Sequence, residues 1–128
     1  MQLDLDSHLG GHRIDAYGEG WVRVGERRFD RSLALSRDAI LEDWRVDTPA
    51  GLTLDHFRRL AEMRPELVLL GTGPTLAFPP TELTLPLIER GIGLEVMDTA
   101  AACRTYNLLA GDGRGVVVAL ILGWNDVP

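Results

Sequence analysis

Two short segments combine residue types that hold ligands in α/β proteins. Gly71-Thr72-Gly73 follows an apolar run, which is where glycine-rich phosphate-binding loops lie. A dinucleotide fingerprint also needs a third glycine and a helix that begins at once. Here Pro74 removes a backbone donor and about seven residues precede the next expected helix. The segment is therefore interpreted either as a tight structural turn or as a loop that contacts a ligand.

Asp98 and Thr99 stand where a second apolar run ends and a helical pattern begins. In open α/β sheets, ligands bind beside the carboxyl ends of the strands, so these residues belong with Gly71, Thr72 and Gly73 to one candidate ligand crevice. The alternative is that Asp98 and Thr99 only cap the helix.

The single cysteine, Cys103, falls in the first turns of that helix, where a thiol can have a depressed pKa and act as a nucleophile. At 100° per residue, however, Cys103 shares a broad face with Ala102 and Tyr106, and no histidine lies nearby to act as a base. We therefore predict that Cys103 packs against a sheet as a small apolar residue.

The opposite face of the same helix carries Arg104, Asn107 and Leu108, and it lacks the paired charges that are typical of a solvated face. Either another part of the chain covers this face or a partner does, and the sequence does not separate the two. These three residues form the candidate contact face.

No residue pattern predicts catalysis or a bound metal or cofactor. The chain has three histidines and one cysteine, and it contains neither an H-E-x-x-H motif nor a G-x-S-x-G elbow. His8 and His12, near Asp4 and Asp6, are expected to bind metal only adventitiously. We therefore assign no catalytic residue, no cofactor and no metal site.

Composition excludes further classes. All 13 basic residues are arginines, so a Schiff-base lysine and a Walker lysine are both excluded. The net charge of −6 gives no global field that would attract a phosphate backbone, and the arginines of residues 23–31 alternate with Glu26 and Asp30. We expect a solvated strand face there and no nucleic-acid partner.

The chain is also expected to stay out of membranes. Its longest apolar run, residues 116–122, is far shorter than the roughly 20 residues that a spanning helix needs. The first residues lack the basic and apolar regions of a secretory signal. With a free thiol, these features predict a cytoplasmic protein.

The elements that must position these residues change character along the chain. The first part reads as short strands, with Gly25-Glu26 suited to a type II′ hairpin turn, and the second part alternates helices and strands. Thr53 is the expected N-cap of the first helix, and Pro86 must either delay or kink the second. The expected strands are residues 14–17, 21–24, 27–29, 32–35, 39–44, 66–70, 93–97 and 116–122, and the expected helices are 54–63, 81–90 and 100–110.

Apolar strands joined by helices predict an α/β fold whose sheet is covered on both faces and is at least partly parallel. At 128 residues the chain is expected to form a single domain, residues 1–128, in which residues 1–12 are either a strand or a frayed tail. The early strands either extend the sheet or cover one of its faces.

Three segments resemble a family of small uncharacterised domains that includes an assembly factor of mitochondrial respiratory complex I (NADH dehydrogenase). They are IDAYGEGWVRVGERRFDRSLAL, ELVLLGTG and RGIGLEVMDTAAACRTYNLLAGDGRGVVVALI, and together they span residues 14–121. The resemblance implies a three-layer α/β domain with a mixed, mostly parallel sheet and an added N-terminal β layer. It also implies that no catalytic activity is established for the group, and that the best-described role is binding of partners during assembly of complex I.

Function follows as two hypotheses. The first is a non-enzymatic binding domain whose partner is an unidentified protein, with a homodimer as a further alternative. The second is a small-ligand-binding protein or an enzyme that uses the crevice at Gly71–Gly73 and Asp98-Thr99.

Overall fold

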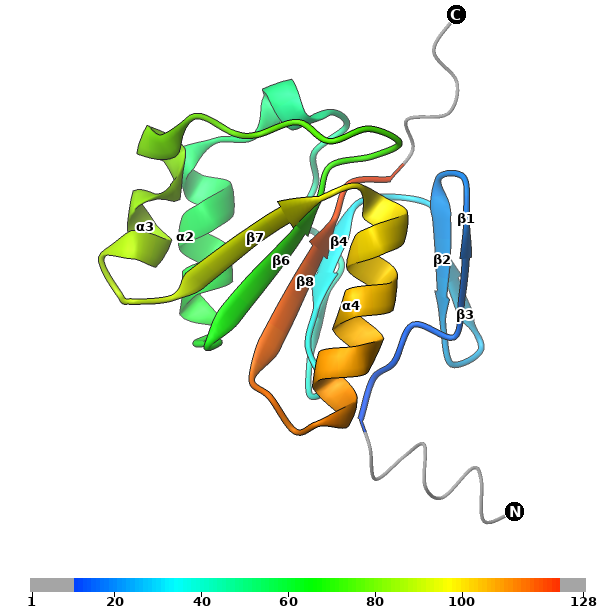
Figure 1. Cartoon of the computed structure of the whole chain (residues 1–128). Helices are drawn as coiled ribbons and strands as arrows, with labels where there is room; N and C mark the ends of the chain where they lie inside the picture. Colours follow the sequence, from blue (N-terminus) through cyan, green and yellow to red (C-terminus); the bar gives the residue numbers. More distant parts are fainter. Residues whose placement is uncertain (1–10, 123–128) are drawn as a thin grey trace, which may run out of the picture.

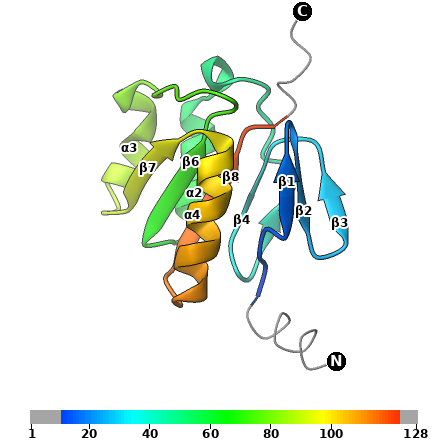
Figure 2. The same cartoon turned by 45° about the vertical axis from the view of Figure 1, so that its right-hand side comes forward.

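The structure is a computed structural model that describes residues 11–122, and its elements form three layers (Figure 1). A five-stranded sheet lies in the middle, with helices α2 and α3 on one face. Helix α4 and a separate three-stranded sheet lie on the other face (Figure 2). The strands are β1 Ala16–Gly18, β2 Trp21–Val24, β3 Arg27–Phe29, β4 Leu33–Leu35, β5 Ile40–Leu41, β6 Leu67–Gly71, β7 Gly93–Met97 and β8 Val116–Leu120. The helices are η1 Pro49–Gly51, α2 Leu54–Glu62, η2 Thr81–Thr84, α3 Leu85–Ile88 and α4 Thr99–Gly111.

The central sheet is mixed, as predicted, with strand order β5-β4-β8-β6-β7. Strand β6 pairs in parallel with both β7 and β8, whereas β4 pairs antiparallel with both β8 and β5. The crossover from β6 to β7 runs through η2 and α3, and the crossover from β7 to β8 runs through α4. The predicted α/β class and three-layer arrangement are confirmed.

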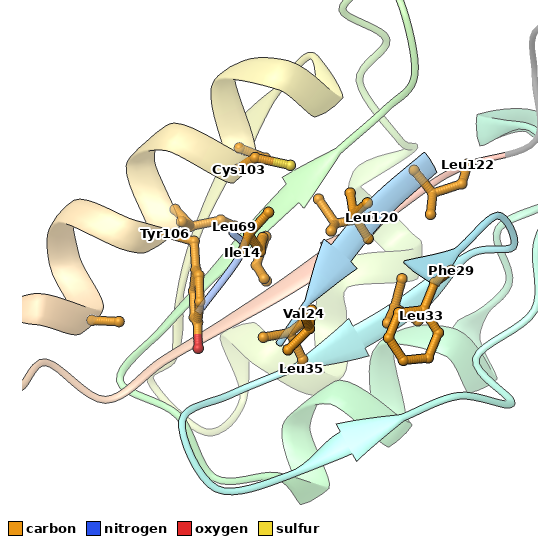
Figure 3. Close-up of a cluster of buried hydrophobic side chains, with 14 of the residues drawn as sticks. Ile14, Val24, Phe29, Leu33, Leu35, Leu69, Cys103, Tyr106, Leu120 and Leu122 are labelled. Atoms are coloured by element: carbon orange, nitrogen blue, oxygen red, sulfur yellow. The ribbon is translucent and has the colours of Figure 1, made fainter. Parts of the chain in front are cut away.

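Alternate side chains of the central strands enter two separate cores. Along β8, Val116, Val118 and Leu120 face α4 and the three-stranded sheet, and Figure 3 shows the core that they join. Val117 and Ala119 face α2 and α3 instead. Because every residue of β8 is buried, the strand shows no polar alternation, and this explains its continuous apolar sequence.

The three-stranded sheet β1-β2-β3 is the added N-terminal layer that the family resemblance implied. Strands β2 and β3 form the predicted hairpin, and Gly25 has a φ of 61°, which suits the first central position of a type II′ turn. Val22 and Val24 point into the core beside Phe29. Apolar burial therefore holds this layer against the central sheet.

Two expected elements are shorter than predicted. The α-helix expected over 81–90 begins late, which is one of the two outcomes predicted for Pro86: a 3₁₀ turn comes first, and the single turn α3 has Pro86 in its first positions. Within α2, Phe57, Leu60 and Ala61 are buried, whereas Leu54 at the first position is 51% exposed. The strand expected over 39–44 is only the two residues of β5. The chain then turns inward at Trp44, whose indole N–H donates to the His56 carbonyl (3.0 Å).

Neither a membrane span nor a metal cluster appears within the described part of the chain. None of the helices there is long and apolar enough to cross a bilayer. Residues 11–122 also contain no group of three His, Cys, Asp or Glu side chains arranged to hold a metal ion. Asp4, Asp6 and His8 lie outside the described residues, as does most of the segment expected to be frayed.

Cys103 lies in the core, as predicted, with no exposed surface (Figure 3). Burial raises the pKa of its thiol to about 12, so the thiol stays protonated at neutral pH. The nucleophile hypothesis for this residue is therefore not supported.

We expect Cys103 to react with a maleimide reagent at pH 7–8 at least about a hundredfold more slowly in the folded chain than in 6 M urea. Reaction requires the core to open, so the labelling rate should increase with denaturant concentration. Equal rates in buffer and in urea would show that the thiol is accessible in the native fold.

Candidate functional site

The two segments predicted to form a ligand crevice lie side by side at the carboxyl ends of β6 and β7. The chain leaves β6 toward the face that carries α3 and leaves β7 toward the face that carries α4 (Figure 1). This divergence makes a topological switch point, where open α/β sheets commonly hold a ligand. The Thr99 N–H donates to the Gly73 carbonyl at 2.9 Å, so the two segments are in direct contact.

The chain's own groups occupy this switch point. The Thr99 hydroxyl accepts a hydrogen bond from the Gly73 N–H (2.8 Å) and donates one to the Ile121 carbonyl (3.1 Å). Thr99 is 3% exposed. A Cβ atom at Gly71 would lie 2.9 Å from the Thr99 Cα, so the absence of a side chain at Gly71 lets α4 approach the end of β6 closely.

Thr72 connects the end of β6 to the loop that follows it. The buried Thr72 hydroxyl donates to the Thr75 carbonyl (2.7 Å) and accepts from the Ala77 N–H (3.1 Å). The Met97 carbonyl lies 3.3 Å from the same oxygen and accepts from the Thr72 N–H at 2.9 Å. Residue 72 thus fixes the course of the loop, and its hydroxyl is not left free for a ligand.

The loop fixed by Thr72, residues 74–80, presents two large apolar side chains to solvent. Phe78 is 72% exposed and Leu76 is 52% exposed. Pro74, Pro79 and Pro80 restrict the backbone of this segment. We call residues 74–80 the apolar loop. The sequence interpretation missed it, although apolar residues among prolines outside any helical or strand pattern were a usable signal.

Asp98 acts as a helix cap. Its Oδ1 accepts a hydrogen bond from the Ala101 N–H at 2.8 Å, and the residue is half-buried. A carboxylate at this position also interacts favourably with the N-terminal end of the α4 dipole. The hydrogen bond that Asp98 makes is therefore that of the N-cap of α4.

The candidate contact face on α4 is divided between the chain itself and solvent. The Asn107 Oδ1 accepts from the Ile14 N–H (2.9 Å), and the Asn107 Nδ2 donates to the Ile14 carbonyl (2.7 Å). These two bonds satisfy the backbone of one residue and attach the N-terminal layer to α4. Asn107 is thus used within the fold.

The other two members of this face remain exposed. The Arg104 Nη1 donates to the Tyr17 hydroxyl at 3.2 Å, and Tyr17 is itself 36% exposed. Leu108 is 69% exposed and points away from the sheet. Arg104 and Leu108 therefore stay available for contact, and Asn107 does not.

The arginine-rich hairpin of residues 21–31 is partly neutralised by its surroundings. Arg27 forms an ion pair with Glu42 (2.8 Å), and this guanidinium lowers the pKa of the Glu42 carboxyl. The Arg28 guanidinium stacks 4.4 Å from the centre of the Trp21 ring. These contacts fit the expectation of a solvated strand face.

Removing the Thr72 hydroxyl should destabilise the fold locally. In Thr72→Val the shape is nearly kept, but the Ala77 N–H and the Thr75 carbonyl lose their partner, so we expect about 1–3 kcal/mol less stability in urea unfolding. Thr72→Ser, which keeps the hydroxyl, should lose less than Thr72→Val. If both variants unfold at the wild-type urea concentration, the hydroxyl does not fix the loop.

A charge at Asn107 should loosen the N-terminal layer. Asn107→Asp replaces the donor to the Ile14 carbonyl with a second acceptor oxygen, and we expect a loss of about 1–3 kcal/mol in urea unfolding. The neighbouring exposed Leu108→Asp is the matched control and should unfold as the wild type does. If Asn107→Asp unfolds at the same urea concentration as the wild type, the two hydrogen bonds between Asn107 and Ile14 do not stabilise the fold.

Comparisons with known proteins agree with this architecture. The human NADH dehydrogenase [ubiquinone] 1 alpha subcomplex assembly factor 3 is 33% identical over 110 residues, which cover 84% of this chain but 59% of the human protein. A protein of Francisella tularensis named 13 kDa major membrane protein is 30% identical over 101 residues, covering 78% of this chain and 80% of that protein. A crystal structure of a Bordetella parapertussis protein superimposes with a TM-score of 0.82 at 38% identity, covering 88% of this chain and 96% of that one.

The chain spans little more than half the length of the human assembly factor, so the similarity concerns the domain described above. The family model described as a protein of unknown function (DUF498/DUF598) matches residues 14–121. The chain therefore belongs to the DUF498/DUF598 family.

Proposed function

We propose that this chain is a non-enzymatic binding domain whose partner is another protein. The observation that carries the proposal is the apolar loop, in which Leu76 and Phe78 are exposed on a segment whose backbone is bonded to the Thr72 hydroxyl and restricted by three prolines. An ordered loop loses little conformational entropy on binding, and an exposed aromatic side chain is a common anchor in protein interfaces.

The names of relatives support the same class of function. Several similar proteins are named assembly factor 3 of the NADH dehydrogenase 1 alpha subcomplex. We propose that this chain likewise contacts a protein during assembly. Because the alignment covers only 59% of the length of the human factor, the partner of this chain need not be the same.

We propose that the chain acts in the cytoplasm, where the free Cys103 thiol stays reduced. We propose no membrane insertion and no nucleic-acid partner.

The alternative of a small ligand or substrate in the crevice is less well supported. A ligand there would have to displace bonds that Thr99 makes to Gly73 and Ile121, or those that Thr72 makes to the loop. Each buried group that lost its partner would then cost free energy unless the ligand replaced it. The geometry thus favours a protein contact on the outer side of the loop.

The arginine and leucine of the candidate contact face form a second proposed contact. Arg104 and Leu108 are both exposed on α4, and Arg104 donates to the Tyr17 hydroxyl. Arginine and tyrosine are enriched in protein interfaces. This face and the apolar loop can be tested separately because no residue is shared between them.

The test is capture of partners from a nuclease-treated native lysate with tagged wild-type and variant chains. The double variant Leu76→Asp/Phe78→Asp should lose at least about tenfold of the specific partner signal because both anchors become charged. Leu54→Asp, at a similarly exposed apolar residue on α2, is the control and should capture as the wild type does. Leu108→Asp reports on the second face.

All variants should keep the wild-type melting temperature, because the substituted side chains are exposed. The proposal fails if the wild type captures no protein above a tag-only control. It also fails if the double variant captures the same proteins in the same amounts as the wild type.

A further inference from the structure

The second half of the apolar loop is bonded to the fold at both of its ends. At one end the Ala77 N–H donates to the Thr72 hydroxyl (3.1 Å). At the other end the Leu83 N–H, within η2, donates to the Pro80 carbonyl (3.1 Å). Figure 1 shows the extended course of the chain along the loop that leads from β6 to α3. The fold thus sets where this short run begins and ends.

Prolines restrict the backbone between these two ends. The ring of a proline holds φ at about −65°, and Pro80 has a φ of −57° and a ψ of 138°. A residue that precedes a proline is pushed to an extended ψ, and this applies to both Phe78 and Pro79. None of the peptide bonds in the described part of the chain is cis. The run Phe78-Pro79-Pro80 is thus confined to extended and polyproline II angles, and Pro80 adopts the latter.

This run offers apolar side chains and unbonded backbone groups. Leu76, Phe78 and Pro80 are all exposed. Neither the N–H nor the carbonyl of Phe78 makes a hydrogen bond to any other residue that the structure describes. A partner could therefore contact both the side chains and the Phe78 carbonyl without breaking a bond of the fold.

The same prolines disfavour pairing with a strand of the partner. A strand that adds to an edge needs an N–H donor at every second residue. On one side of the run, the Ala77 N–H is bonded to the Thr72 hydroxyl and Pro79 has no N–H. On the other side, Pro80 has no N–H, so Phe78 is the single donor. An added strand would thus find too few donors here.

A polyproline II segment is recognised in another way. Its backbone has no internal hydrogen bonds, and grooves lined by aromatic side chains bind it because its extended shape is already formed. Such binding needs no backbone N–H at the prolines, so it suits this run where strand addition does not.

From the proline angles, the exposed apolar side chains and the missing donors, we propose that residues 76–80 dock as a polyproline II ligand in an aromatic-lined groove of the protein partner. An indole N–H or a tyrosine hydroxyl of the groove donates to the Phe78 carbonyl. Because the run is restricted before binding, it loses little conformational entropy. This inference rests on the proposed function, since it names the kind of partner that the apolar loop contacts.

Replacing the two prolines tests the proposal. The relevant proteins are those that the wild type captures from lysate and that Leu76→Asp/Phe78→Asp loses. Pro79→Ala/Pro80→Ala keeps both apolar anchors but relaxes the run and adds two N–H donors. We expect it to lose at least about tenfold of that signal, whereas addition of a strand would be strengthened. Pro74→Ala, in the same loop but outside the run, is the control and should capture as the wild type does.

Photo-cross-linking with the prolines intact tests the kind of groove. Thr75→p-benzoylphenylalanine places the cross-linker beside the run, and mass spectrometry of the product identifies the partner's contact surface. We expect a surface rich in tryptophan, tyrosine or phenylalanine, and alanine in place of these residues should abolish capture.

The outcomes separate this inference from the proposed function. If the wild type captures no protein through the apolar loop, the proposed function itself fails. If capture depends on Leu76 and Phe78 but persists in Pro79→Ala/Pro80→Ala, the polyproline inference alone is overturned. Cross-links to a surface without aromatic side chains, or to the edge of a sheet, would overturn it as well.

Discussion

Burial of β8 on both faces is the constraint on which the rest of the structure depends. Its side chains enter the α4 core and the α2–α3 core in alternation, so one strand joins the three layers. A polar residue on either face would be buried without a partner and would cost free energy. The strands β6 and β4 on either side of β8 must therefore also be apolar, and polar chemistry is confined to the ends of the strands.

The ends of the strands show how this chain departs from a ligand-binding α/β protein. A switch point is present between β6 and β7, but Thr99 and the backbone of Gly73 fill it with mutual hydrogen bonds. The polar groups that would bind a small molecule hold the chain to itself instead. Beyond them, the two large apolar side chains of Leu76 and Phe78 are exposed, and this is why we argue for a protein contact rather than catalysis.

Local pattern predicted much of the fold. The bounds of β2, β3 and β7, the Thr53 and Asp98 caps and the burial of Cys103 follow from apolar spacing and capping residues, which act over a few neighbours. The short length of β5 did not follow, because the chain turns inward at Trp44, whose buried indole bonds to the His56 carbonyl 12 residues further along the chain.

The site was predicted less completely for the same reason. The rule that ligands bind beside the carboxyl ends of strands predicted that Gly71–Gly73 and Asp98-Thr99 lie at one edge of the sheet. It did not predict the hydrogen bonds between the two segments. Likewise, the hydrogen bonds between Asn107 and Ile14 join residues 93 positions apart. The spacing of residues along the helix left open whether the chain itself or a partner covers that face.

The central claim is that the chain itself closes the switch point. The most direct test is native-state hydrogen exchange of the free protein at the Gly73, Ala77 and Thr99 amides, whose donors are bonded to the Thr99 hydroxyl, the Thr72 hydroxyl and the Gly73 carbonyl. The account predicts slow exchange at Gly73 and Thr99, with opening free energies close to that of global unfolding, and measurable protection at Ala77. Rapid exchange at Gly73 and Thr99 would show an open crevice and would contradict the account.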